Sequence, residues 1–161
     1  MPEMGRDTVL DYRPGPDSEL PLEAGETVLA TFLPDAGRYW KDHALLGLLG
    51  VALVALGLWY LGNLGQFPVA AIAIVVGMTL RGWYFRSEVF ARRWQLTERR
   101  LIGPQGRQVM LLEITTIRRL MGDVQIVTKS GGKHLIRHQA DGDATKHRIE
   151  AAKAARESGA R

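Results

Sequence analysis

The stretch ALLGLLGVALVALGLWYL, residues 44–61, decides the fold class, because it runs for eighteen residues without a charge. A helix of this length spans roughly 27 Å, which approaches the hydrocarbon core of a bilayer at about 30 Å. An uncharged turn follows, and a second apolar run, FPVAAIAIVVGMTL, covers residues 67–80. Aromatic residues after Arg81 extend this run to the interface. The pattern predicts a transmembrane helical hairpin over residues 43–85, with helices at about 44–61 and 67–85.

Aromatic and arginine side chains flank both predicted helices, where a bilayer meets water. The expected interface anchors are Trp40, Trp59, Tyr60, Trp83, Tyr84, Arg81 and Arg86. Basic residues precede the first helix and follow the second, whereas the turn between them has no charge. Because basic residues favour the cytoplasmic side, we expect a multi-pass protein of the bacterial inner (cytoplasmic) membrane with both termini in the cytoplasm. The lipid bilayer is then its first partner.

Small residues recur on both predicted helices. Gly50 and Gly57 lie seven residues apart on the first helix, and Ala73 and Gly77 lie four apart on the second. Such spacing permits close backbone contact, either within the hairpin or against another protein. A soluble protein with a buried helical hairpin is disfavoured, because the rest of a 161-residue chain is too short to cover two helices that are apolar all round.

Charge is divided unevenly along the chain, although the net charge is only +4. Residues 1–42 contain four Lys or Arg and nine Asp or Glu, whereas residues 81–161 contain seventeen and eight. An acidic arm therefore precedes the apolar block, and a basic region follows it. This asymmetry indicates an anionic partner for the second half. The absence of cysteine excludes disulfides, thiolate nucleophiles and cysteine-based zinc sites.

Short runs typical of β-strands follow the second predicted helix. The segment GDVQIVTKSGGKHLIRH, residues 122–138, predicts a β-hairpin that turns at Ser-Gly-Gly. Earlier runs bring the expected total to five or six antiparallel strands: WQLT (94–97), RRLI (99–102), QVMLLEI (108–114) and TTIRRLM (115–121). Residues 141–159 predict a closing helix capped by Asp141 or Asp143. Residues 26–33, ETVLATFL, have strand character and either pair with this β region or lie along the membrane surface.

The order of these motifs resembles the bacterial pleckstrin-homology-like (PH-like) membrane proteins. Residues 94–102 are similar to the family's opening element, aromatic-x-aliphatic-Thr-x-x-Arg-aliphatic-Ile. Ile114 and Ile117 fit its Ile-x-x-Ile element, and residues 122–131 fit its hairpin. Residues 26–29 resemble the short strand that often precedes the membrane helices in that family.

The resemblance covers about residues 25–155, and the link between Ile117 and Gly122 is shorter than the family pattern. It implies an α+β membrane protein in which a two-helix transmembrane hairpin is followed by a small antiparallel PH-like β-barrel or sheet with a C-terminal helix. The expected organisation is a mobile acidic N-terminal arm (1–25), a short strand and juxtamembrane segment (26–42), the transmembrane hairpin (43–85) and a cytoplasmic PH-like domain (88–158).

No arrangement of residues with catalytic chemistry stands out, so we expect no enzyme, no cofactor and no metal site. His134 and His138 lie four residues apart on a predicted strand, a distance of about 13 Å that is too long for one ion. Asp141 and Asp143 flank a glycine without EF-hand spacing, and a helix-capping turn explains them better. The Ser-Gly-Gly turn at residues 130–132 lacks the strand–loop–helix context of a phosphate loop.

The remaining signal is a group of basic residues in the predicted β domain. The candidate docking or headgroup patch consists of Arg118, Arg119, Lys129, Lys133 and Arg137. The sequence leaves three interpretations of these side chains open: they face anionic headgroups, they dock a protein, or they form a solvated surface. Almost no aromatic residue lies among them to stack bases, so no nucleic acid partner is expected.

The resemblance implies a membrane-attached binding module, because the members of that family have no catalytic reaction in common. Some photosynthetic-complex assembly proteins of purple bacteria are similar in layout. We therefore expect a non-enzymatic inner-membrane accessory or assembly protein whose PH-like domain docks onto a larger membrane protein complex, such as a respiratory or photosynthetic one. The alternative is a membrane-anchored module that recognises anionic lipid headgroups through its basic domain. The charge asymmetry also suggests that the acidic arm folds back onto this domain and covers it.

Overall fold

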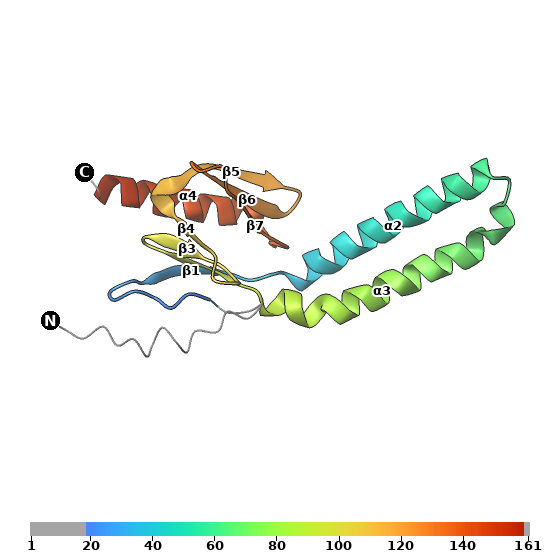
Figure 1. Cartoon of the computed structure of the whole chain (residues 1–161), viewed down its shortest axis with the longest axis horizontal. Coiled ribbons are helices and arrows are strands. Elements are labelled where there is room, and N and C mark those ends of the chain that lie inside the picture. The colour runs from blue at the N-terminus through green and yellow to red at the C-terminus, as the bar shows by residue number, and fades with distance from the viewer. Residues whose placement is uncertain (1–18, 160–161) are drawn as a thin grey trace.

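The computed structural model describes residues 19–159, in which two long helices project from a smaller body of strands (Figure 1). The elements in chain order are β1 (Val28–Phe32), α2 (Ala36–Tyr60), a 3-10 turn (Leu64–Gln66), α3 (Phe67–Ala91), β2 (Trp94–Thr97), β3 (Arg100–Ile102), β4 (Gln108–Met110), a second 3-10 turn (Leu111–Glu113), β5 (Ile114–Leu120), β6 (Asp123–Thr128), β7 (Lys133–Ile136) and α4 (Gly142–Gly159). This order confirms an α+β chain with two apolar helices, antiparallel sheets and a C-terminal helix.

Helices α2 and α3 pack against each other and leave most of their apolar surface uncovered. The carboxylate of Asp35 caps α2 by accepting a hydrogen bond from the backbone N–H of Arg38 at 2.7 Å, and a proline occupies the first turn of α3. Only Tyr39 and Gly82 are buried in the two helices. By length and composition, both helices are apolar enough to cross a membrane.

The small residues of the two helices have different surroundings. A Cβ atom at Gly50 would contact the side chain of Ile74 on the partner helix, so Gly50 lies in the hairpin interface. Within the described chain, Gly57 and Gly77 have no neighbouring atom within 4 Å of such a Cβ. Packing inside the hairpin therefore accounts for Gly50 but not for Gly57 or Gly77.

The strands form two antiparallel sheets, one with the order β1-β2-β3-β4 and one with the order β5-β6-β7. Helix α4 packs against β5, β6 and the second 3-10 turn. Its buried residue Ile149 joins a core that both sheets share. The largest fully buried apolar side chains of this core are Leu96, Leu101, Leu111, Ile114, Ile126, Ile136 and Ile149.

Strand β1 pairs with β2, which settles one of the alternatives for residues 26–33. Phe32 lies opposite Trp94, and Ala30 lies opposite Leu96. The two long helices are therefore an insertion between neighbouring strands of one sheet. A β domain that starts at residue 88 would begin inside α3 and would lack β1.

This insertion makes a testable prediction about the sheets. Because Phe32 and Trp94 are paired, a turn of about four residues containing Asn-Gly should be able to replace residues 34–92. The shortened chain should be soluble and unfold cooperatively, whereas residues 88–158 alone should not fold, because the apolar strand β2 loses one of its two partner strands. Dispersion of amide resonances and thermal unfolding followed by circular dichroism would test both chains. A well-folded 88–158 fragment would contradict the role assigned to β1.

Candidate functional site

An ion pair between Glu26 and Arg100 lies inside the first sheet. The Arg100 side chain is 6% exposed and the Glu26 side chain 0% exposed. Nε of Arg100 donates to Oε1 of Glu26 at 3.0 Å, and a terminal nitrogen donates to Oε2 at 2.8 Å. The Thr97 hydroxyl also donates to Oε1 of Glu26, at 2.7 Å. The Thr and Arg of the motif at residues 94–102 thus both bind a carboxylate that precedes the helices.

Two further N–H groups of Arg100 donate to acceptors outside this pair. The guanidinium donates to Oε1 of Gln108 at 2.7 Å and to the carbonyl of Pro21 at 3.1 Å. The backbone N–H of Glu23 donates to Oε2 of Glu26 at 2.8 Å. Hydrogen bonding from Arg100 lowers the pKa of Glu26 from its usual 4.5 to about 2, against the opposing effect of burial.

This pair should make the stability of the chain sensitive to acid. Since the folded-state pKa of Glu26 lies below the usual value of 4.5, its stabilising contribution is complete above pH 4.5 and is lost as the pH falls towards 2. Glu26→Gln should lower the free energy of unfolding at pH 7 by about 3 kcal/mol and flatten its pH dependence below pH 4.5. Thermal unfolding of the full chain in detergent, measured over this pH range, would test this, with Glu113→Gln as the exposed control. An unchanged acid profile in Glu26→Gln would contradict the assignment.

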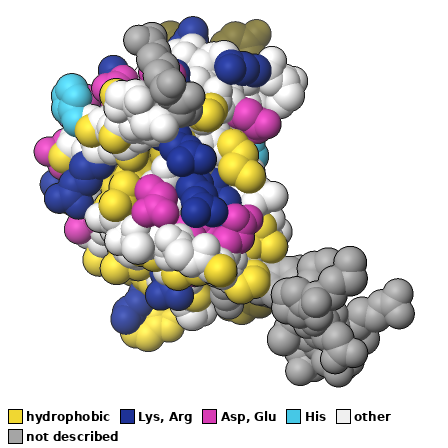
Figure 2. Space-filling view, turned by 90° about the vertical axis from the view of Figure 1, so that its left-hand side faces the viewer, with side chains coloured by type: hydrophobic (Ala, Val, Ile, Leu, Met, Phe, Trp, Pro, Cys, Tyr) yellow, Lys and Arg dark blue, Asp and Glu magenta, His cyan; other side chains and the backbone are white. Residues whose placement is uncertain are grey.

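The described end of the acidic arm lies against basic side chains. Glu19 accepts a hydrogen bond from Nε of Arg93 at 2.6 Å, and Glu23 lies 3.6 Å from both Arg99 and Arg100. Figure 2 shows the face of the molecule away from the long helices, where acidic and basic side chains are interspersed rather than forming a continuous basic surface. The predicted mobile arm covers residues 1–25, and residues 1–18 of it lie outside the part of the chain that the structure describes.

The five residues of the candidate patch do not form one surface. Arg118 and Arg119 are consecutive on β5, so their side chains point to opposite faces of the second sheet. Arg119 pairs with Asp143 at the start of α4. Lys133 begins β7 opposite Val127 on the same outer face as Arg118, and Lys129 follows β6. Arg137 follows β7.

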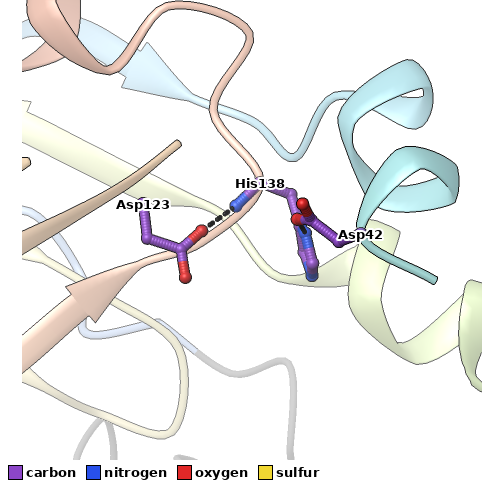
Figure 3. A group of neighbouring side chains, drawn as sticks. All are labelled: Asp42, Asp123 and His138. Atoms are coloured by element: carbon purple, nitrogen blue, oxygen red, sulfur yellow. Dashed lines mark hydrogen bonds and ion pairs between the residues drawn. The ribbon is translucent and has the colours of Figure 1, made fainter. Parts of the chain in front are cut away.

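Three side chains join the start of α2 to the second sheet (Figure 3). Nδ1 of His138 lies 3.0 Å from Oδ2 of Asp42, and the backbone N–H of His138 donates to Oδ1 of Asp123 at 2.8 Å. Two further hydrogen bonds lie beside them. The backbone N–H of Asp35 donates to the His138 carbonyl at 2.7 Å, and the Gln139 amide donates to the Leu33 carbonyl at 3.3 Å.

Asp42, Asp123 and His138 are the one group of three in the described residues whose ligand atoms lie within 4.8 Å of one another. Their surroundings favour a structural link over a cation site. The guanidinium of Arg38 lies 3.1 Å from Asp42, and the backbone and ring contacts of His138 already engage both carboxylates. We therefore assign the group to the attachment of α2 to the second sheet.

A cavity of about 210 Å³ lies where the end of α3 meets the strands. Three arginines line it: Arg92 from the end of α3, Arg107 from the β3–β4 turn and Arg137 from the end of β7. No acidic residue lines this cavity, and Phe32 and Trp94 form part of its apolar wall. Burial first, and the charge of Arg107 second, lower the pKa of the nearby His134.

A second cavity of about 330 Å³ adjoins the first, and the two share Val89, Arg92, Arg137 and His138. It extends between α2 and α3 as far as Arg81, with Leu46 and Phe85 in its wall. Glu88 and Asp42 also line it, but Glu88 pairs with Arg92, and Asp42 contacts Arg38 and His138. The two cavities adjoin along these shared residues, and together, as the groove, they reach from the β3–β4 turn to the apolar helices.

Of the three arginines in the first cavity, only Arg137 belongs to the predicted docking or headgroup patch. Arg81 was expected only to anchor the interface, and Arg92 and Arg107 were not included. Arg107 lies in a turn, and no spacing relates it to Arg92 or Arg137. The seven expected interface residues are all exposed. Trp59 and Tyr60 lie at the end of α2 and Trp40 in its second turn, whereas Arg81, Trp83, Tyr84 and Arg86 lie before the last turn of α3.

The tip of the β5–β6 hairpin was also not predicted as a site. Leu120 and Met121 are exposed there, Met121 to 81%, and they line a shallow cavity together with Leu45 and Leu46 of α2. Two large apolar side chains of the β body thus lie beside the beginning of the apolar stretch of α2.

Comparison with known proteins gives no relative. No protein-family model, no curated protein and no solved structure matches the chain. The site must therefore be interpreted from its own geometry.

Proposed function

We propose that this chain is a non-enzymatic accessory or assembly protein of the bacterial inner membrane. Helices α2 and α3 cross the membrane as a hairpin, both termini lie in the cytoplasm, and the two sheets with α4 form a PH-like domain. This domain docks onto a larger membrane protein complex. Arg38 and Lys41 lie in the first turns of α2. Arg81 and Arg86 lie in the second half of α3, and Arg92 and Arg93 follow it. This placement of basic residues, together with the uncharged turn between the helices, supports the topology.

One observation carries the proposal: the hairpin is inserted between two paired strands of one sheet. A domain that searches for soluble ligands needs only a flexible tether. Here β1 leads into α2 and α3 leads into β2, while His138 holds α2 to the second sheet. The sheets therefore keep one orientation relative to the helices, which favours docking onto a partner that is itself fixed in the membrane.

The outer face of the second sheet is the docking surface that the contacts favour. Helix α4 and the core cover its inner face, whereas Arg118 and Lys133 are exposed on the outer one. Val127 and Leu135 lie on the same face and are half-buried. Apolar side chains with cations beside them match the composition of a protein interface with a polar rim.

If the outer face of the second sheet docks the partner, reversing the charge of its basic side chains should release the membrane subunits that co-purify with the chain. Arg118→Glu with Lys133→Glu should lower the yield of co-purifying membrane subunits by about tenfold or more, because like charges across a rim cost affinity. The measurement is affinity purification of the full chain from native membranes in mild detergent, with mass spectrometry of the bound proteins.

The matched control is Arg107→Glu with Arg137→Glu, which makes the same charge change in the groove. Retention of partners in this control and loss in the outer-face variant would support the assignment of the docking face. Equal retention in both variants would remove that face from the proposal. A chain that brings no membrane subunits with it, even as the wild type, would contradict the docking function.

A further inference from the structure

We propose that the groove between α3 and β7 binds the phosphate group of an anionic phospholipid. The phosphate lies among Arg92, Arg107 and Arg137 in the first cavity. The acyl chains leave through the second cavity towards Leu46 and Phe85. This site serves the alternative expectation, recognition of anionic headgroups, and it shares only Arg137 with the predicted patch.

The chemistry of the first cavity selects an anion. Three arginines from three separate parts of the chain line it, and none of its lining residues is acidic. In the described part of the chain, Arg107 and Arg137 have no carboxylate within 4.0 Å. Planar guanidinium groups bind phosphate oxygens in pairs, so this arrangement suits a phosphate better than a carboxylate of the chain itself.

Arg92 contributes a further unsatisfied donor. Its terminal nitrogen pairs with Glu88, but its Nε is buried without a hydrogen-bond partner among the described residues. A buried donor without a partner is costly. The atom is closed to solvent, so an oxygen of a bound phosphate would satisfy it only after the Arg92 side chain turns towards the cavity.

The second cavity indicates that the phosphate belongs to a lipid. The second cavity has the apolar side chains of Val89, Phe85 and Leu46 in its wall and includes Arg81. Its two carboxylates, Asp42 and Glu88, are paired with basic residues of the chain. Arg81 directly follows the uncharged run at residues 67–80. A free phosphate would use only the first cavity, whereas an amphiphile with a charged head and apolar chains matches both parts of the groove.

The exposed hairpin tip at Leu120 and Met121 indicates that the groove lies close to the level of the lipid headgroups. It lies beside Leu45 and Leu46 of α2, so the β body approaches the level at which the apolar stretch of α2 begins. If the helices span the bilayer, lipid headgroups surround the groove. A lipid therefore needs to move only a short way out of its leaflet to enter.

The test is native mass spectrometry of the full chain in detergent, with phosphatidylglycerol and phosphatidylcholine added in equal amounts. Wild-type protein should retain phosphatidylglycerol selectively. Arg107→Gln with Arg137→Gln should weaken its retention by about 25-fold, since a basic side chain near an anionic lipid contributes about fivefold. Arg118→Gln with Lys133→Gln makes the same charge change on the outer sheet face and should stay within about twofold of wild type.

A third variant, Arg107→Lys with Arg137→Lys, keeps the charge and removes the planar donors, and it should fall between the other two. Its thermal unfolding, compared with that of wild type, separates a binding defect from a folding defect. Inorganic phosphate, added at constant ionic strength, distinguishes the source of the ligand. No displacement of phosphatidylglycerol by millimolar phosphate supports a lipid site, whereas full displacement would overturn the lipid assignment in favour of free phosphate. Equal retention of the two lipids, or an unchanged Gln variant, would overturn the site itself.

Discussion

The buried ion pair between Glu26 and Arg100 is the constraint on which the rest of the arrangement depends. It joins a segment before the long helices to a strand after them, across 74 residues of sequence. Removing either partner would leave an uncompensated charge inside the sheet, so the two segments must stay together. Because they stay together, the helices must leave the sheet and return to it at neighbouring points, which is the geometry of a hairpin.

Much of this fold is readable in the sequence because its elements have clear periodicities. The uncharged run at 44–61, the alternation in residues 122–138 and the cap at Asp141 each predict an element that the structure contains. One run misleads: residues 108–114 read as a single strand, but Leu111–Glu113 form a 3-10 turn. Leu111 is fully buried there, and its N–H bonds to the carbonyl of Arg99, so a tertiary contact overrides the local pattern.

The groove could not be predicted from sequence periodicity. Arg92, Arg107 and Arg137 come from a helix end, a turn and a strand end, and only the packing of the two sheets brings them to one cavity. The predicted patch failed to form one surface for the opposite reason. Arg118 and Arg119 are neighbours in sequence, but the pleat of β5 separates them. Charged residues that are close in sequence show only that one helix or strand carries charge. A binding site needs residues from several elements, and only the folded structure shows which of them meet.

The two ends of the hairpin are attached to the sheets unequally. Helix α3 continues directly into β2 of the first sheet, whereas α2 is continuous with β1 and is also held to the second sheet through Asp42 and His138. A tilt of α2 would therefore strain both sheets, and a tilt of α3 mainly one. The groove lies between α3 and β7, on the side with fewer attachments. An occupant of the groove would contact α3 and the second sheet at once, and would link them where residues 19–159 form no hydrogen bond or ion pair.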